Sequence, residues 1–181
     1  MEKLLTTGKV RAIGVCNFTI PRLDALLNKT TVVPAVNQVE LHPFFQQRAL
    51  IDWCGSKGIK MQAYSPLGNN QYGLQRAIDD PRICTLATSL SLTPAQLVYS
   101  WGVQRGYCVL AKSVTQERIL SNLNIQTLPD SAMQVLAGLD RNTRYNFPVN
   151  WGIDIFSEWD TQELKRAAAE KRDLNKRKFD I

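Results

Sequence analysis

The chain of 181 residues is 44% hydrophobic and 21% charged, an ordinary composition for one globular domain that excludes the disordered and fibrous classes. Lys and Arg outnumber Asp and Glu by 22 to 16, but much of this excess lies in residues 165–178, where it is typical of a solvated helical face rather than a polyanion site. No apolar run approaches the roughly 20 residues of a membrane span and the first residues do not resemble a signal peptide, so we expect a cytoplasmic protein that binds neither nucleic acid nor membrane.

Four short apolar runs are predicted to form the strands of one sheet. The runs are residues 10–15, 32–39, 59–63 and 107–111. The first run is apolar on both faces, which is typical of buried parallel strands. Helical patterns separate the runs, so we expect right-handed crossovers and parallel pairing in an α/β fold.

Helices are predicted between these strands and after the last one. Residues 2–5 form a piece of amphipathic helix that ends at Gly8, and the later helices cover residues 21–27, 48–57, 81–90, 94–105, 115–123 and 129–139. Thr93 and Gln96 have the spacing of a capping box, and Thr115 is the predicted cap of the fifth later helix. An aromatic loop over residues 145–152 and a basic helix that starts near Asp160 complete a single domain of residues 1–181.

The segment after the fourth strand has the most specific pattern for binding a ligand. Lys112 and Ser113 stand at the end of the strand, and Arg118 and Asn122 follow on one face of the next helix. Lysine, hydroxyl, helix NH groups and arginine together suit a phosphate monoester. The alternative is a capped helix whose basic side chains are only solvated.

Other strand ends carry groups suited to a flat, polar ring. Asn17 and Gln38 offer a donor and an acceptor each, which matches a carboxamide such as that of nicotinamide, although each is also suited to capping a loop. Tyr64 is placed to stack on a ring or to pack at the rim of the core. The backbone of the Ser65-Pro66-Leu67-Gly68 turn is expected to lie near a second anionic group of the ligand.

The single histidine and the cysteines are interpreted as structural. His42 lies between a strand and Pro43, where an imidazole bonds nearby backbone or Glu40, so we prefer this role to that of a general base. The four cysteines are widely spaced without a C-x-x-C pair, which indicates free thiols and predicts no metal site.

Four motifs together resemble, in order and spacing, the second half of the aldo-keto reductase family. They are Gly14-Val15-Cys16-Asn17-Phe18, Asn37-Gln38-Val39-Glu40-Leu41-His42-Pro43, Ala63-Tyr64-Ser65-Pro66-Leu67-Gly68, and Lys112-Ser113-Val114 with Arg118. The resemblance extends to about Trp151. It implies that residues 1–128 are the C-terminal half, strands five to eight, of a (β/α)8 TIM barrel, and that residues 129–181 are the final helix, aromatic loop and basic tail helix. It also implies an oxidoreductase that transfers hydride between NADPH and a carbonyl or alcohol substrate.

The resemblance further implies which residues bind the nicotinamide end of the cofactor. Asn17 and Gln38 would hold the carboxamide, next to Cys16, which stands where the family usually has Ser. Tyr64 would stack on the nicotinamide ring. The family's catalytic Asp, Tyr, Lys and His come from its first four strands and have no counterpart here, so the resemblance assigns no catalytic residue.

The phosphate and adenine contacts implied by the resemblance favour NADP over NAD. Ser65 and Leu67 would approach the pyrophosphate. The 2'-phosphate would be gripped by the motif residues Lys112, Ser113, Val114 and Arg118. Asn122 would reach the adenine.

Met1 stands where the family has internal helix sequence, so we expect a truncated chain that is inactive alone or is half of a split enzyme. The alternative is a non-catalytic nucleotide-binding or interaction module. Four parallel strands leave two open edges and apolar inner residues, so we also expect self-association, binding of a complementary N-terminal half, or aggregation.

Overall fold

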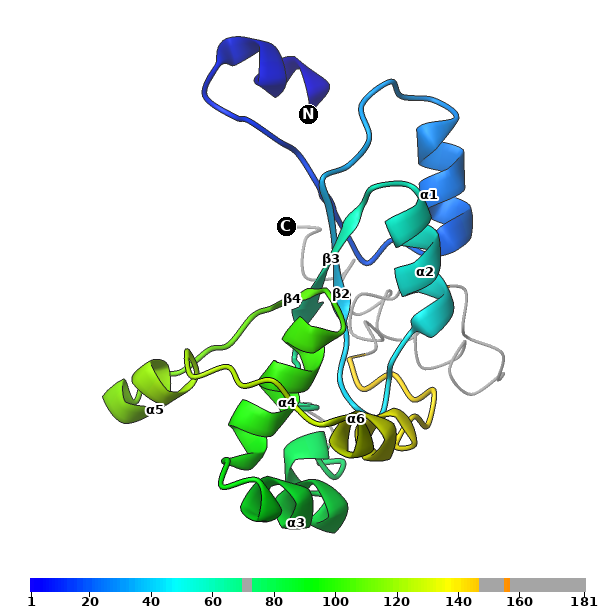
Figure 1. The fold of residues 1–181 in the computed structure, drawn as a ribbon. Coiled ribbons are helices and arrows are strands. Elements are labelled where there is room, and N and C mark those ends of the chain that lie inside the picture. Colours follow the sequence, from blue (N-terminus) through cyan, green and yellow to red (C-terminus); the bar gives the residue numbers. More distant parts are fainter. Residues whose placement is uncertain (70–72, 147–154, 157–181) are drawn as a thin grey trace, which may run out of the picture.

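The computed structural model describes residues 1–69, 73–146 and 155–156, and its centre is a sheet of four strands (Figure 1). The strands are β1 (Val15–Cys16), β2 (Val36–Glu40), β3 (Lys60–Tyr64) and β4 (Cys108–Val109). They lie side by side in chain order, and every neighbouring pair is parallel. The predicted α/β class with parallel strands is therefore confirmed, and the arrangement is consistent with part of a (β/α)8 barrel.

The two outer strands are shorter than predicted. β1 and β4 each have two residues, where runs of six and five were expected. Each has a strand neighbour on one side only within the described part of the chain, so half of its backbone hydrogen-bonding capacity has no strand partner. Hydrogen bonds from Ala35 NH to Ile13 O and from Leu110 NH to Ala63 O continue the alignment just outside the strands.

The helices among the described residues are η1 (Glu2–Thr7), α1 (Ile20–Leu27), α2 (Arg48–Ser56), η2 (Ala77–Asp79), α3 (Pro81–Ser89), α4 (Pro94–Gln104), α5 (Gln116–Ser121) and α6 (Asp130–Ala137), where η marks a 3-10 helix. All the helices predicted between residues 21 and 139 are present with shifted ends. The first segment is wrong in type, because η1 is a 3-10 helix with no buried residue rather than an amphipathic α-helix. It stands apart from the sheet in Figure 1.

Local capping explains where two of the helices begin. Thr93 Oγ1 accepts from Gln96 NH at 3.2 Å while Gln96 Oε1 accepts from Thr93 NH at 2.9 Å, so the predicted capping box is present. Asp80 caps α3 by accepting from Arg82 NH at 2.9 Å. Thr115, predicted as the cap of α5, makes no side-chain capping bond, and α5 ends at Ser121 rather than at residue 123.

The hydrophobic core lies on one face of the sheet, between the strands and the helices. α2 packs against β3 and α4 packs against β4, and the core includes Leu97, Trp101, Phe44 and Leu136. Alternate strand residues point into it, namely Asn37, Val39, Met61 and Ala63. The opposite face is only half covered, since Val36, Gln38 and Gln62 are half-buried.

This arrangement corrects one prediction about the open face of the sheet. We expected apolar residues of the strand runs to be exposed there, but Val39, Met61 and Ala63 are buried against the helices. The open face carries the amide side chains of Gln38 and Gln62, together with the half-buried Val36. Exposed apolar side chains gather around α5, at Val103, Leu110, Val114, Ile119, Leu120, Leu123 and Ile125.

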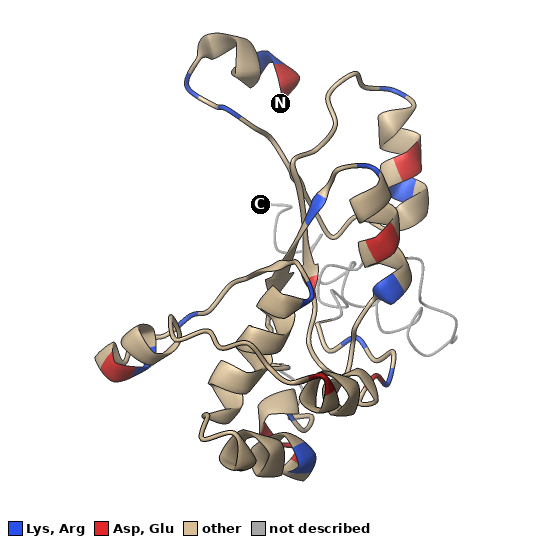
Figure 2. Ribbon diagram, in the orientation of Figure 1, with Lys and Arg blue, Asp and Glu red and all other residues tan. Residues whose placement is uncertain are grey.

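Acidic and basic residues lie together on helices α1 and α2. Figure 2 shows basic and acidic side-chain positions next to each other on α1 and α2, so neither helix presents a surface of one sign. The predicted basic tail helix and most of the aromatic loop lie outside the described residues. No helix in residues 1–69, 73–146 or 155–156 is long and apolar enough to cross a membrane.

Candidate functional site

Polar side chains meet at the carboxyl ends of β1, β2 and β3, where we expected a ligand. Asn17 follows β1 directly, and its NH donates to Gln38 O in β2 at 2.9 Å. Asn17 has φ 58° and Ser65, after β3, has φ 48°, so both strands end in a left-handed turn. Such conformations are uncommon for residues other than glycine, and they re-aim the chain at the rim of the sheet.

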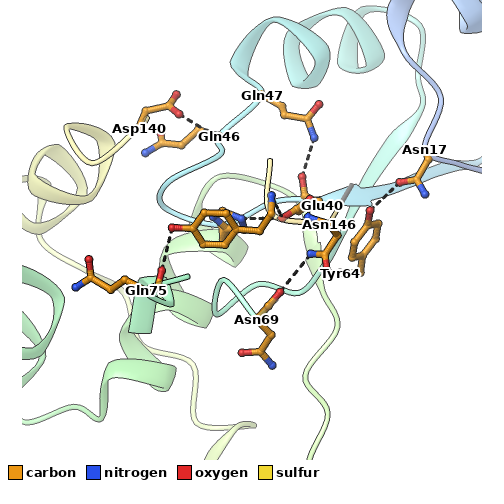
Figure 3. A network of polar contacts seen from close by, with 11 residues as sticks. Asn17, Glu40, Gln46, Gln47, Tyr64, Asn69, Gln75, Asp140 and Asn146 are labelled. Atoms are coloured by element: carbon orange, nitrogen blue, oxygen red, sulfur yellow. Dashed lines mark hydrogen bonds and ion pairs between the residues drawn. The ribbon is translucent and has the colours of Figure 1, made fainter. Parts of the chain in front are cut away.

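Asn17 and Tyr64 form a direct contact at this rim. The Tyr64 hydroxyl donates to Asn17 Oδ1 at 3.0 Å, as Figure 3 shows. Burial raises the pKa of Tyr64, and the nearby negative charge of Glu40 raises it further. Tyr64 therefore remains a neutral phenol that donates a hydrogen bond to Asn17.

Gln38 is held by a residue that we did not single out from the sequence. Gln38 Nε2 donates to Gln62 Oε1 at 2.6 Å, and the two residues are directly opposite each other in β2 and β3. Cys16 lies opposite Gln38 on its other side and is exposed. The missed signal is an amide in the middle of the third strand, two residues before Tyr64 and so on the same face.

Behind this rim, Glu40 and His42 form a fully buried pair. His42 Nε2 and Glu40 Oε1 are 3.0 Å apart, which confirms the structural interpretation of the histidine. The carboxylate also accepts from the NH groups of Tyr145 at 2.9 Å and Asn146 at 3.0 Å. Burial acts to raise the pKa of Glu40, but the hydrogen bond and charge of His42 and the two NH groups outweigh it and lower the pKa.

Further polar contacts join the same region to the loops around it. Gln47 Nε2 donates to Glu40 O at 2.7 Å, and Asn146 Nδ2 donates to Asn69 O at 3.2 Å (Figure 3). The turn after β3 is closed by Gly68 NH, which donates to Ser65 O at 2.9 Å, and Leu67 O accepts from Ile78 NH at 3.2 Å. Ser65 and Leu67 therefore lie in one tight turn at the end of β3.

The residues predicted to bind a phosphate are only partly brought together. An open pocket of about 660 Å³ between α4, β4 and α5 is lined by Lys112, Ser113 and Asn122 along with apolar side chains. Arg118 is exposed and does not line it, and Val114 is 84% exposed. Ser113 Oγ accepts from Thr115 NH at 3.0 Å, so this hydroxyl closes the turn before α5.

The two groups of predicted residues lie in different parts of the molecule. Asn17 and Tyr64 meet at the ends of β1 and β3, and Gln38 lies in the middle of β2, where its backbone O accepts from Asn17 NH. The pocket with Lys112 adjoins α5, which stands away from the sheet in Figure 1. All four cysteines are free thiols, as predicted. The residues that the structure describes contain no cluster of three or more His, Cys, Asp or Glu side chains suited to a metal ion.

Comparison with known proteins identifies the family. Residues 1–141 match the model of the aldo/keto reductase family. The chain is 41% identical over 175 residues to a D/L-glyceraldehyde reductase of Hypocrea jecorina, covering 91% of this chain and 52% of that protein. It is 42% identical over 156 residues to an aldehyde reductase of Saccharomyces cerevisiae, covering 84% and 49%. A glycerol 2-dehydrogenase (NADP(+)) of the same yeast is 43% identical over 145 residues, covering 78% and 45%.

The chain thus spans about half the length of the curated relatives that it matches. The family model covers more than three quarters of its 181 residues, from the first residue to residue 141, four residues after the end of α6. On this match and these identities, the chain belongs to the aldo/keto reductase family.

Proposed function

We propose that the chain is the nucleotide-binding part of an NADP(H)-dependent oxidoreductase, with a small carbonyl compound or alcohol as substrate. The observation that carries this proposal is the pair of amides on adjacent strands, one directly after β1 and one in the middle of β2. Asn17 is hydrogen-bonded by Tyr64 and Gln38 by Gln62, so one end of each side-chain amide is already engaged within the protein. A primary carboxamide has NH donors and a carbonyl acceptor, and two fixed amides suit it. The nicotinamide ring carries this group, with Cys16 nearby and Tyr64 as its stacking partner.

The pocket beside α5 supports the choice of NADP over NAD. Lys112 and Ser113 supply a cation and a hydroxyl for the 2'-phosphate, and Arg118 and the exposed Val114 segment adjoin them in sequence. Asn122 and the apolar lining suit adenine. The Ser65–Leu67 turn would face the pyrophosphate. One yeast relative is NADP-dependent by name, and NADP(H) is accordingly the proposed cofactor.

Within this site, bound NADP(H) would supply or accept a hydride, and the residues of this chain would bind and orient it. The names of the relatives, reductases of glyceraldehyde and aldehydes and a glycerol dehydrogenase, support a small carbonyl or alcohol as the substrate class. A cytoplasmic location remains our expectation.

We infer that the chain alone does not carry the whole reaction. Tyr64 donates to Asn17 and has a raised pKa, and His42 is fully buried against Glu40, so neither is placed as the proton donor. This favours, as a second candidate, a nucleotide-binding module or one half of a split enzyme that corresponds to strands five to eight of the barrel. Its partner would then be the complementary half or a second copy.

The proposed function is tested by calorimetric titration of the purified full chain with 2',5'-ADP, 5'-ADP, NADP+ and NAD+. We expect 2',5'-ADP and NADP+ to bind more tightly than their counterparts without the 2'-phosphate. No binding of 2',5'-ADP, or equal binding of each matched pair, would overturn the proposed NADP site.

A further inference from the structure

One row of side chains crosses the open face of the sheet. Cys16, Gln38, Gln62 and Cys108 are directly opposite one another from β1 to β4. They lie on the face turned away from the helices, because the residues that alternate with them are buried in the core or, at Val15 and Val109, packed against it. Gln38 and Gln62 are neighbours in the centre of this row, and their amides bond to each other at 2.6 Å.

This bond gives the Gln38 amide a direction. A glutamine amide has a donor end and an acceptor end, and the donor Nε2 of Gln38 is directed at Gln62 Oε1. Gln38 Oε1 is therefore the end left for a ligand, and it is an acceptor. In this pairing Gln62 presents its acceptor Oε1, whereas a side chain at position 62 that can only donate would turn the Gln38 amide around.

The neighbouring amide has the opposite direction. The Tyr64 hydroxyl donates to Asn17 Oδ1, which leaves the donor Nδ2 for a ligand. The rim thus offers one acceptor, from Gln38, and one donor, from Asn17. A group with both an NH2 and a carbonyl satisfies the two together, whereas a ketone at the same place leaves Gln38 Oε1 without a partner.

We propose that Gln62 is a positioning residue that orients the Gln38 amide and thereby makes the site select a primary carboxamide over a ketone on the cofactor ring. The proposal rests on the proposed function, because it concerns the nicotinamide end of NADP(H). Gln62 acts through Gln38, and it is not a contact of the cofactor.

The test compares NADP+ with its 3-acetylpyridine analogue, in which a methyl ketone replaces the carboxamide. Both carry the same charge, so the ratio of their dissociation constants cancels general electrostatic effects of a substitution. We expect the full wild-type chain to bind NADP+ about fivefold more tightly, as for one neutral hydrogen bond. 2',5'-ADP, which lacks the ring, reports on folding and on the phosphate pocket.

Three variants separate positioning from packing. In Gln62→Glu the carboxylate only accepts, so the direction of Gln38 and the roughly fivefold ratio are expected to remain. In Gln62→Lys the ammonium only donates, which turns Gln38 around, and Gln62→Met keeps the size without a strong hydrogen bond. For both, the ratio is expected to fall to about one while 2',5'-ADP binds as in the wild type.

Each other outcome has a definite meaning. The positioning role would be overturned if the ratio of the two dissociation constants stayed near five in the Lys and Met variants, or if it were one in the wild type. In either case, binding of 2',5'-ADP would leave the proposed function standing. Loss of 2',5'-ADP binding in the variants alone assigns Gln62 a structural role and overturns the proposal. Failure of the wild type to bind 2',5'-ADP removes the proposed function, and this proposal with it.

Discussion

The carboxylate of Glu40 accepts a hydrogen bond from the backbone NH of Tyr145 at 2.9 Å, although the two residues are 105 positions apart in the sequence. The bond joins the end of β2 to the segment after α6. His42 completes the arrangement by occupying the same carboxylate from within the core. A buried acidic side chain is costly unless it is paired and hydrogen-bonded, and here all its partners come from this chain.

Glu40→Gln is expected to destabilise the protein by about 2 kcal/mol, because an amide NH2 would face a backbone NH where the carboxylate accepts. Glu40 has a lowered pKa in the folded state, so its charge contributes stability above its ordinary pKa of 4.5, and this is lost as pH falls through the folded-state value. Denaturant unfolding of both proteins at pH 7 and near pH 3.5 checks this, with the gap between them narrowing at the lower pH.

Glu117→Gln in α5 is the matched control, since Glu117 is exposed. Its free energy of unfolding is expected to stay within about 0.5 kcal/mol of the wild type. A Glu40→Gln variant as stable as this control would show that the buried carboxylate does not anchor the segment after α6.

Local signals in the sequence predicted most of the fold. The Thr93–Gln96 capping box and the Leu spacing after Pro21 involve residues within one or two helical turns, so they are visible without the fold. The parallel order of the strands followed from the helices between them. The lengths of β1 and β4 did not, because they depend on how many strand neighbours each one has.

The sequence suggested residues for the candidate site but not the contacts that their side chains make. Strand ends suggested Asn17, Gln38 and Tyr64, whereas the bond between Gln38 and Gln62 depends on the register of β2 against β3, which no local pattern encodes. The contact of Glu40 with Tyr145 depends in the same way on the path of the chain after α6. Side-chain pairs made across the fold are therefore what the sequence alone did not supply.

Tyr64→Phe is expected to weaken NADP+ binding about fivefold, because Asn17 loses the hydroxyl that holds its Oδ1 while the aromatic ring remains. Binding of 2',5'-ADP is expected to be unchanged. Tyr107→Phe, which removes a buried hydroxyl in the core beside Trp101, serves as the control and is expected to leave NADP+ affinity unaltered. Equal affinities of Tyr64→Phe and wild type would place the hydroxyl outside the site.

Arg118→Ala is expected to weaken NADP+ binding by about 1.5 to 3 kcal/mol, the range for a charge-assisted bond to phosphate, with NAD+ binding unchanged. Arg11→Ala removes another exposed arginine that lies before β1, and we expect it to affect neither cofactor. Titration calorimetry measures both ratios. Similar losses for NADP+ and NAD+ would assign Arg118 to the structure of α5 rather than to the 2'-phosphate.

The purified chain alone is expected to show no reduction of aldehydes by NADPH above background. His42 is fully buried against Glu40, and the Tyr64 hydroxyl is engaged with Asn17, so neither of these described residues is placed for general acid catalysis, which is worth about 10² to 10⁴ in rate. Loss of NADPH absorbance with a panel of aldehydes measures this. Turnover that follows the protein through two chromatographic steps would contradict it.

The purified chain is also expected to self-associate. Apolar side chains around α5 are exposed, with Leu123 at 77% and Leu120 at 64%, and β1 and β4 have unpaired edges within the described part of the chain. Two sets of four parallel strands match the eight of a closed barrel, so a dimer is geometrically reasonable.

Light scattering after size-exclusion chromatography measures the mass of the chain in solution. A double variant, Leu120→Gln with Leu123→Gln, is expected to shift this mass towards that of the monomer. Val33→Gln changes an exposed apolar residue outside this group and is expected to have no such effect. A wild-type chain that runs as a stable monomer, unfolds cooperatively and binds no hydrophobic dye would mean that these edges and side chains need no partner.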